Sequence, residues 1–213
     1  MLRKSNAPGS RRSGSRPAAV IRTRRAYFDF GFGQLHVRTA FPATGGFDEQ
    51  PPLFCIHPGD ASSRLFDPFL AAIAERRSVY APDLPGCGES DPAPLGAGAA
   101  GAAAIRDLAR DLRLRRIDLI AAGDGAGVAL EVASAAPDLV RRLVLVGNPA
   151  PDRLAALAQP TLLLATGAPS ATLRERSQEG RVERVQVGEY GDQPFALAPA
   201  ALAVRVAEFL DRP

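Results

Sequence analysis

The segment from residue 117 to residue 136 constrains the fold of this chain more than any other. A mostly apolar run, Ile117–Ala121, is followed by Gly123-Asp124-Gly125 and then by the helical run Ala126–Ala136, which Pro137 stops. The short apolar run indicates a buried strand, and the glycines allow a sharp turn. A strand that leads directly into a helix is the building unit of a parallel sheet covered by helices.

The rest of the chain repeats this alternation of short apolar runs and helical runs. Strands are predicted at 26–30 and 34–40, as a hairpin around Gly31–Gly33, and at 52–56, 78–81, 117–121, 143–146, 161–165 and 181–187; helices are predicted at 64–76, 99–114, 126–136 and 199–210. Leu143–Val146 and Thr161–Ala165 are almost entirely apolar, as expected for strands that helices cover on both faces. The pattern predicts the α/β class.

The first 25 residues differ in composition from the remainder. They hold eight basic residues and no acidic one, whereas residues 26–213 hold 18 basic and 23 acidic residues, a net charge of −5. They are also rich in Ser, Gly and Pro and have almost no apolar periodicity, which is typical of disorder. We expect a disordered basic tail over residues 1–25 and one domain over residues 26–213. The tail is interpreted as a solvated extension, so nucleic-acid binding is not expected.

Cysteine content and hydropathy argue against a disulfide-rich protein, a structural metal site and a membrane protein. Cys55 and Cys87 are too few for a disulfide framework, and free thiols suit the reducing cytoplasm. The sequence contains no Cys/His cluster, so we predict no structural metal site, and we expect no cofactor. No apolar run is long enough to cross a membrane. The expected location is therefore cytoplasmic, without a membrane span.

Five segments carry a resemblance to a known family. They are the hairpin from Arg25 to His36; Phe54-Cys55-Ile56-His57-Pro58-Gly59; Ala81–Ser90, with the pattern Asp-x-Pro-Gly-x-Gly-x-Ser; the turn Ala121–Gly125; and Pro137–Val146. Their order and spacing resemble the α/β-hydrolase superfamily, in the branch of epoxide hydrolases, haloalkane dehalogenases and esterases. The resemblance implies an α/β-hydrolase fold over residues 26–211: a mostly parallel, twisted sheet with helices on both faces and an N-terminal β-hairpin.

The same resemblance implies a nucleophile elbow, which in this family reads small-x-nucleophile-x-small. The flanking strand and helix both fit without a gap when Gly123 is the central residue, and glycine has no side chain to attack a substrate. Placing Asp124 at the centre would give an aspartate nucleophile, but it requires one inserted and one deleted residue. Gly123 is therefore the favoured, vacant nucleophile position, with Asp124 as the alternative.

The family's catalytic base and acid are missing in the same alignment. The base is a His that follows the last strand, but the two histidines of this chain, His36 and His57, both precede residue 58. The alignment puts Asp192 at the base position, where a carboxyl with a reference pKa of ~3.9 is a poor base near neutrality. The loop of residues 166–170, where the acid is expected, contains neither Asp nor Glu. His57 remains a fallback acid/base, although in this family the residue is usually structural.

The resemblance also implies a helical lid after the strand that ends at Gly147, and the chain departs from it here. Residues 148–160 leave room for no more than two helical turns, so we expect no lid domain. Without a lid, Leu154, Leu157 and Phe195 are expected to lie near solvent. An exposed apolar patch marks an interaction surface, so a homodimer or a protein partner is predicted over this face.

The residues expected to line a ligand pocket at the open edge of the sheet are His57, Pro58, Gly59, Asp60, Gly123, Asp124 and Asp192. Three functions remain open at this point. The first is a family member without hydrolytic activity that binds a small molecule or a partner. The second is a hydrolase acting on small ester, epoxide or halide substrates through displaced residues, Asp124 or His57. The third is a scaffold or subunit that packs on a partner.

Overall fold

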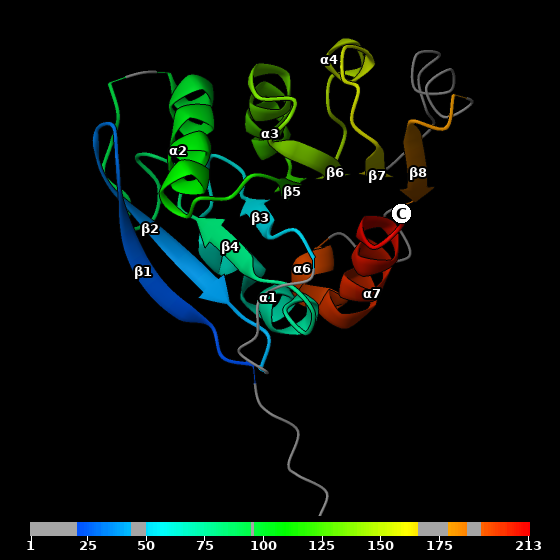
Figure 1. The fold of residues 1–213 in the computed structure, drawn as a ribbon, viewed down its shortest axis with the longest axis horizontal. Coiled ribbons are helices and arrows are strands. Elements are labelled where there is room, and N and C mark those ends of the chain that lie inside the picture. Colours follow the sequence, from blue (N-terminus) through cyan, green and yellow to red (C-terminus); the bar gives the residue numbers. More distant parts are fainter. Residues whose placement is uncertain (1–20, 44–49, 95, 166–178, 187–192) are drawn as a thin grey trace, which may run out of the picture.

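The structure is a computed structural model that describes residues 21–43, 50–94, 96–165, 179–186 and 193–213. The strands are β1 (Arg24–Phe30), β2 (Gly33–Ala40), β3 (Leu53–Ile56), β4 (Val79–Pro82), β5 (Ile117–Ala122), β6 (Val140–Val146), β7 (Thr161–Ala165) and β8 (Val182–Gln186). The helices are the 3-10 helix η1 (Ser63–Phe66) and α1 (Asp67–Ile73), α2 (Ala97–Asp111), α3 (Gly125–Ala135), α4 (Pro151–Ala155), α6 (Pro194–Leu197) and α7 (Pro199–Leu210). All eight strands form one sheet (Figure 1).

The sheet order is β1-β2-β4-β3-β5-β6-β7-β8. β1 and β2 are antiparallel to each other, β2 is antiparallel to β4, and all other neighbours are parallel. The chain leaves β3 toward β4 on one side and leaves β5 toward β6 on the other. Connections that diverge from two adjacent strands leave a crevice at the carboxyl ends of those strands, where open α/β sheets bind ligands. The predicted fold class is confirmed.

Helices cover both faces of this sheet. α2, α3 and α4 lie on one face, and α1, α6 and α7 lie on the other (Figure 1). Successive residues of a strand point to opposite faces. In β5, Leu119 and Ala121 therefore join the core beneath α2 and α3, whereas Ile120 and Ala122 join the core beneath α1 and α7. This double burial explains why the central strands are apolar at nearly every position.

The N-terminal hairpin is present, with β1 beginning at Arg24 and Ile21 packed against the core before it. Arg24 and Arg25, which composition assigned to the tail, lie in β1, so the predicted boundary falls inside this strand. Residues 1–20 lie outside the described residues, and the disordered tail stays a prediction.

Two predicted elements differ from the structure for identifiable reasons. The helix expected at 64–76 is divided into η1 and α1, because Pro68 in the first turn of α1 has no N–H to continue a helical ladder from η1. The strand expected at 143–146 begins at Val140, so it includes two arginines. Between β6 and β7 the chain forms only the five-residue α4, so there is no lid domain at this point, as expected.

A buried ionic cluster explains how arginines fit into a strand of the sheet. Asp118, fully buried in β5, accepts hydrogen bonds from Arg77 at 3.1 Å and from Arg141 at 3.0 and 2.7 Å. Arg141 and Arg142 also donate to the carbonyl of Leu210 at the end of α7, at 2.6 and 2.8 Å. A buried charge is tolerated when it is paired and hydrogen-bonded. The cluster therefore attaches α7 to the amino-terminal edge of the sheet.

Gly125, the first residue of α3, is the point where this helix approaches the end of β3, at the opposite, carboxyl edge of the sheet. A Cβ at this position would overlap the carbonyl of His57 and would lie 3.1 Å from the carbonyl oxygen of Ile56. Neither obstacle is a flexible side chain; both are backbone groups at the end of β3. Only glycine allows α3 to begin this close to β3.

We predict that Gly125→Ala lowers the free energy of unfolding by more than ~2 kcal/mol, because the backbone of β3 or α3 must shift to relieve the overlap. Urea unfolding followed by circular dichroism measures this change. The matched control is Gly98→Ala in α2, where a Cβ meets nothing within 4 Å and the substitution should stabilise by roughly 0.5–1 kcal/mol. Equal unfolding midpoints for the two variants would contradict the prediction.

Candidate functional site

The turn between β5 and α3 shows which residue occupies the elbow. Gly123 has φ of +55°, in the left-handed region, whereas Asp124 has ordinary right-handed helical angles of −72° and −16°. The N–H of Gly123 donates to the carbonyl of Val146 at 2.9 Å, which ties the turn to the end of β6. The strained position of the elbow is therefore Gly123, and Asp124 is the residue after it.

His57, at the end of β3, is fully buried and has backbone partners for both ring nitrogens. Nε2 accepts the N–H of Leu84 at 2.8 Å, so the ring proton lies on Nδ1, which donates to the carbonyl of Pro58 at 2.6 Å. Burial lowers the pKa of His57; the Pro58 hydrogen bond and the nearby Asp83, Asp124 and Asp60 oppose this effect without cancelling it. In this arrangement His57 holds two loops together and offers no free nitrogen to a ligand.

Asp83, directly after β4, organises the loops around His57. Its carboxylate accepts the N–H of Ser63 at 2.6 Å, the N–H of Glu89 at 2.8 Å and Nδ1 of His36 at 2.9 Å. Burial alone would raise the pKa of Asp83, but these donors outweigh it, and the pKa lies below its usual value. Gly88 has φ of +54°, and a Cβ there would collide with this carboxylate. Sequence reasoning identified the segment but not this role.

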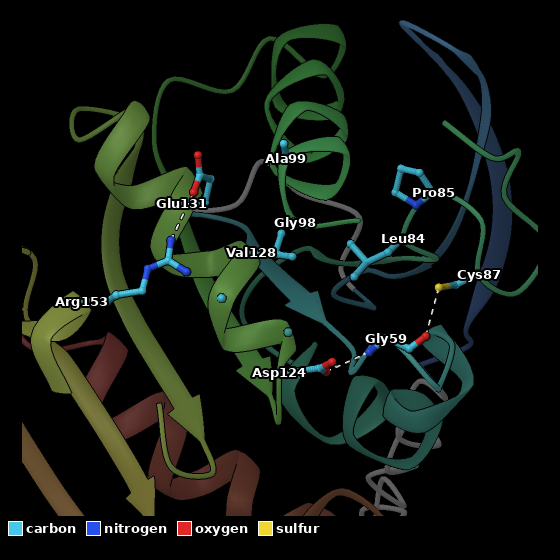
Figure 2. A pocket seen from close by; sticks show the side chains of 12 residues that line it. Gly59, Leu84, Pro85, Cys87, Gly98, Ala99, Asp124, Val128, Glu131 and Arg153 are labelled. Atoms are coloured by element: carbon cyan, nitrogen blue, oxygen red, sulfur yellow. Dashed lines mark hydrogen bonds and ion pairs between the residues drawn. The ribbon is translucent and has the colours of Figure 1, made fainter. Parts of the chain in front are cut away.

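The exposed carboxylate of Asp124 reaches across to the loop after β3. The N–H of Gly59 donates to Oδ1 of Asp124 at 2.9 Å (Figure 2). In the hydrolase family that this sequence resembles, an N–H from this loop and the N–H of the residue after the nucleophile form the oxyanion hole. By position those two groups are the N–H of Gly59 and the N–H of Asp124. One of them is occupied by the side chain of Asp124 itself.

A pocket of about 210 Å³ opens beside this contact. It lies between α3, the start of α2 and the loop after β4, with α4 at its far end (Figure 2). Its lining consists of Gly59, Leu84, Pro85, Cys87, Gly98, Ala99, Asp124, Gly125, Gly127, Val128, Glu131 and Arg153. The wall is mostly apolar. Asp124 stands at one end, and a Glu131–Arg153 ion pair of 3.1 Å stands at the other.

Only some of the predicted pocket residues meet here. Gly59 and Asp124 line the pocket, and Gly123 lies beside it, where a Cβ would be 3.2 Å from Cγ of Pro58. His57 is buried beneath the loop, and Asp60 is exposed on it. Asp192 and residues 166–170 lie outside the described residues, so the base and acid positions stay predictions.

The structure adds pocket residues that sequence reasoning missed. Leu84 and Cys87 belong to the Ala81–Ser90 segment, so their closeness to the elbow could have been inferred from the family resemblance. Val128 and Glu131 follow the elbow at helical spacing, on the side of α3 that lines the pocket. Arg153 had no sequence signal, because its position depends on the path of the chain between β6 and β7.

The prediction of an exposed apolar patch is wrong for its three residues. Leu154 and Leu157 are buried in the core on the α3 face. Phe195 is buried with its ring edge-on to Phe66 and Phe69, at centroid distances of 4.8 and 5.4 Å. Without a lid domain these side chains fold inward, because burying apolar surface is more favourable than exposing it. The exposed patch therefore no longer supports a homodimer or a partner over this face, and both stay predictions.

Within the described part of the chain, no group of three or more His, Cys, Asp and Glu side chains is placed to hold a metal ion. None of the helices in these residues is long and apolar enough to span a membrane.

Comparison with known proteins places this geometry in context. The sequence model of the alpha/beta hydrolase family matches residues 53–213. Uncharacterized proteins of Mycobacterium tuberculosis and Mycobacterium bovis are each 37% identical to the chain over 110 residues. The matched segment is 51% of this chain but only 31% of each relative, so the chain spans about a third of their length.

Solved structures share the fold at low sequence identity. A putative hydrolase from Bacillus subtilis has a TM-score of 0.73 and 18% identity, covering 89% of this chain and 92% of its own. The carboxylesterase CesB from Bacillus subtilis has a TM-score of 0.72 and 19% identity, covering 91% and 93%. The epoxide hydrolase CorEH has a TM-score of 0.70 and 16% identity, covering 88% and 98%. These similarities show the fold alone.

We predict that His57 in the folded protein is still neutral, with its proton on Nδ1, when the pH falls just below the ordinary histidine pKa of 6.5. Because the pKa is lowered in the folded state, the unfolded chain takes up the proton more readily. The stability contributed by neutral His57 is therefore complete above about pH 6.5 and is lost as the pH falls through the folded pKa. Long-range 15N–1H correlation spectra report both the tautomer and the titration.

The chain has two histidines, and the spectrum of a His57→Gln variant identifies which signals belong to His57. A ring that carries its proton on Nε2, or that titrates at or above the ordinary value, would show that His57 is available as an acid/base.

Proposed function

The chain belongs to the alpha/beta hydrolase family, and from this membership we propose that it is a non-hydrolytic member that binds a small, largely apolar molecule in the pocket beside the elbow. The observation that carries the proposal is the left-handed turn at Gly123. Covalent catalysis in this family requires a nucleophilic side chain at that position. Glycine keeps the geometry of the turn and supplies no nucleophile.

The neighbouring groups support the same proposal. A hydrolytic nucleophile needs a base within hydrogen-bond reach. No histidine follows residue 57 in the sequence, and the nitrogens of His57 are both engaged with backbone groups. The pocket has the features of a binding site, which are a concave, mostly apolar wall and a few polar groups.

The size and lining of the pocket indicate the kind of ligand. At about 210 Å³ it is smaller than the ~300–1,000 Å³ of sites for drug-sized molecules. Leu84, Pro85 and Val128 offer apolar contact (Figure 2). A single ring or a short branched chain with one polar group fits this description.

Hydrolysis through displaced residues is the alternative, because Asp124 is exposed and lines the pocket. The carboxylesterase and epoxide hydrolase with this fold are hydrolases by name. An aspartate nucleophile here would have to act from a helical backbone position, after releasing the N–H of Gly59. The cytoplasmic location and a protein partner remain predictions.

We predict that the purified chain hydrolyses 4-nitrophenyl acetate no faster than an equal amount of an unrelated protein without this fold. Such a control is needed because oxyanion groups alone can leave residual catalysis in this kind of site. The release of 4-nitrophenolate, measured by absorbance, gives the rate. Saturable turnover that disappears in Asp124→Ala would overturn the proposal and support hydrolysis.

We also predict that a ligand in the pocket protects Cys87 from alkylation. Cys87 is half-buried and lines the pocket, whereas Cys55 is fully buried. Burial raises the pKa of the Cys87 thiol, and Asp83 and Asp124 add to this effect, so labelling should be slow and should accelerate with pH. Phenylacetamide, benzyl alcohol and cyclohexanol serve as probes of one ring with one polar group.

Mass spectrometry of iodoacetamide labelling measures this protection, and Cys87→Ser gives the background from Cys55. At least one probe should slow labelling several-fold in a saturable manner. Unchanged labelling with all three probes at millimolar concentration would count against a binding pocket.

A further inference from the structure

We propose that Asp124 determines the charge of the ligand that the pocket accepts, by keeping its own carboxylate on the backbone N–H that would otherwise bind an oxyanion. The pocket then accepts neutral or cationic ligands and excludes carboxylates. This inference rests on the proposed binding function and names the ligand class for that same site.

The geometry of the Asp124–Gly59 contact is the first support. Oδ1 of Asp124 accepts the N–H of Gly59 at 2.9 Å, and Oδ2 would lie 3.3 Å from a Cβ built on Gly59. Both carboxylate oxygens therefore lie against Gly59. A ligand oxyanion can reach this N–H only if the carboxylate moves away. The side chain thus acts as an internal anion in the oxyanion hole.

The balance of charge in the pocket is the second support. Its charged lining residues are Asp124, Glu131 and Arg153. Glu131 and Arg153 pair with each other at 3.1 Å, so their charges largely cancel at the far end. Within the described residues, Asp124 has a backbone partner and no ion-pair partner. Within the described residues, no side-chain cation therefore offsets the negative charge of Asp124 at the elbow.

The surroundings of the elbow add to this charge. Asp83 is buried behind the same loops, and both Asp83 and Asp124 act on the Cys87 thiol at the pocket wall in the direction that disfavours a second negative charge. Like charges brought together by binding repel each other. A carboxylate ligand meets this repulsion, and it finds the N–H of Gly59 already bonded to Asp124. An amide of the same shape carries no net charge, so it does not meet this repulsion.

Two substitutions separate the effect of the Asp124 charge from the effect of its hydrogen bond to the N–H of Gly59. Asp124→Asn removes the charge but keeps an oxygen that can accept the N–H of Gly59. Asp124→Ala removes the charge and also frees the N–H. Carboxylate affinity should therefore rise in the order wild type, Asp124→Asn, Asp124→Ala. The control is Asp60→Asn, which removes the same amount of charge from the exposed loop after β3, outside the pocket lining.

The experiment titrates 15N-labelled protein with phenylacetate and, separately, with phenylacetamide, which has the same shape and no charge. The amide signals of Gly59 and Val128 report binding at the two sides of the pocket. The wild type should bind phenylacetamide at least ~10-fold more tightly than phenylacetate. Asp124→Ala should bind phenylacetate at least ~10-fold more tightly than the wild type does, with the Gly59 amide shifting the most.

The outcomes distinguish this inference from the proposed function. If the wild type binds both probes equally, or if Asp60→Asn admits phenylacetate as well as Asp124→Ala does, Asp124 does not set the charge and only the binding function stands. If the wild type binds neither probe but Asp124→Ala binds phenylacetate, the inference stands and the proposed function fails. If no variant binds either probe, both are overturned. Thermal unfolding of each variant verifies that it is folded.

Discussion

The close approach of α3 to the end of β3 is the constraint on which the rest of the site depends. Gly125 lies against the carbonyls of Ile56 and His57, where no side chain fits. Two residues before it, Gly123 adopts the left-handed conformation of the turn that leads into α3. The same approach brings the loop of Gly59 within hydrogen-bond distance of Asp124. The elbow, the pocket and the Asp124–Gly59 contact therefore all lie around this close contact between backbones.

The loops around this contact are held by buried polar groups whose partners are backbone atoms. His57 joins the end of β3 to the loop after β4 through the N–H of Leu84, and Asp83 joins that loop to η1 through the N–H of Ser63. A buried polar group without a partner is costly, so such residues are structurally constrained whether or not a reaction takes place. This explains how such a site architecture can persist in a chain whose elbow carries glycine at position 123.

The site therefore combines the fold of the alpha/beta hydrolase family with a glycine at the elbow. Glycine replaces the expected nucleophile, and the carboxylate of the next residue occupies one of the two N–H groups that stabilise an oxyanion in hydrolases. An acyl-transfer site requires that N–H to be free as negative charge develops. A binding site does not, and there a fixed carboxylate discriminates between ligands by charge. Both features underlie our proposal that the site binds a ligand selectively and does not hydrolyse esters.

The sequence by itself determined the fold and the absence of a nucleophile at Gly123. Apolar periodicity and turn glycines act locally, and a side chain that is missing from the sequence is missing in every conformation. Only the tertiary structure decided the contact of Asp124 with Gly59, which joins residues 65 positions apart, and the Glu131–Arg153 pair. It also decided that Leu154, Leu157 and Phe195 are buried. These features depend on distances between remote segments, which are set by how the helices pack on the sheet and not by any local pattern.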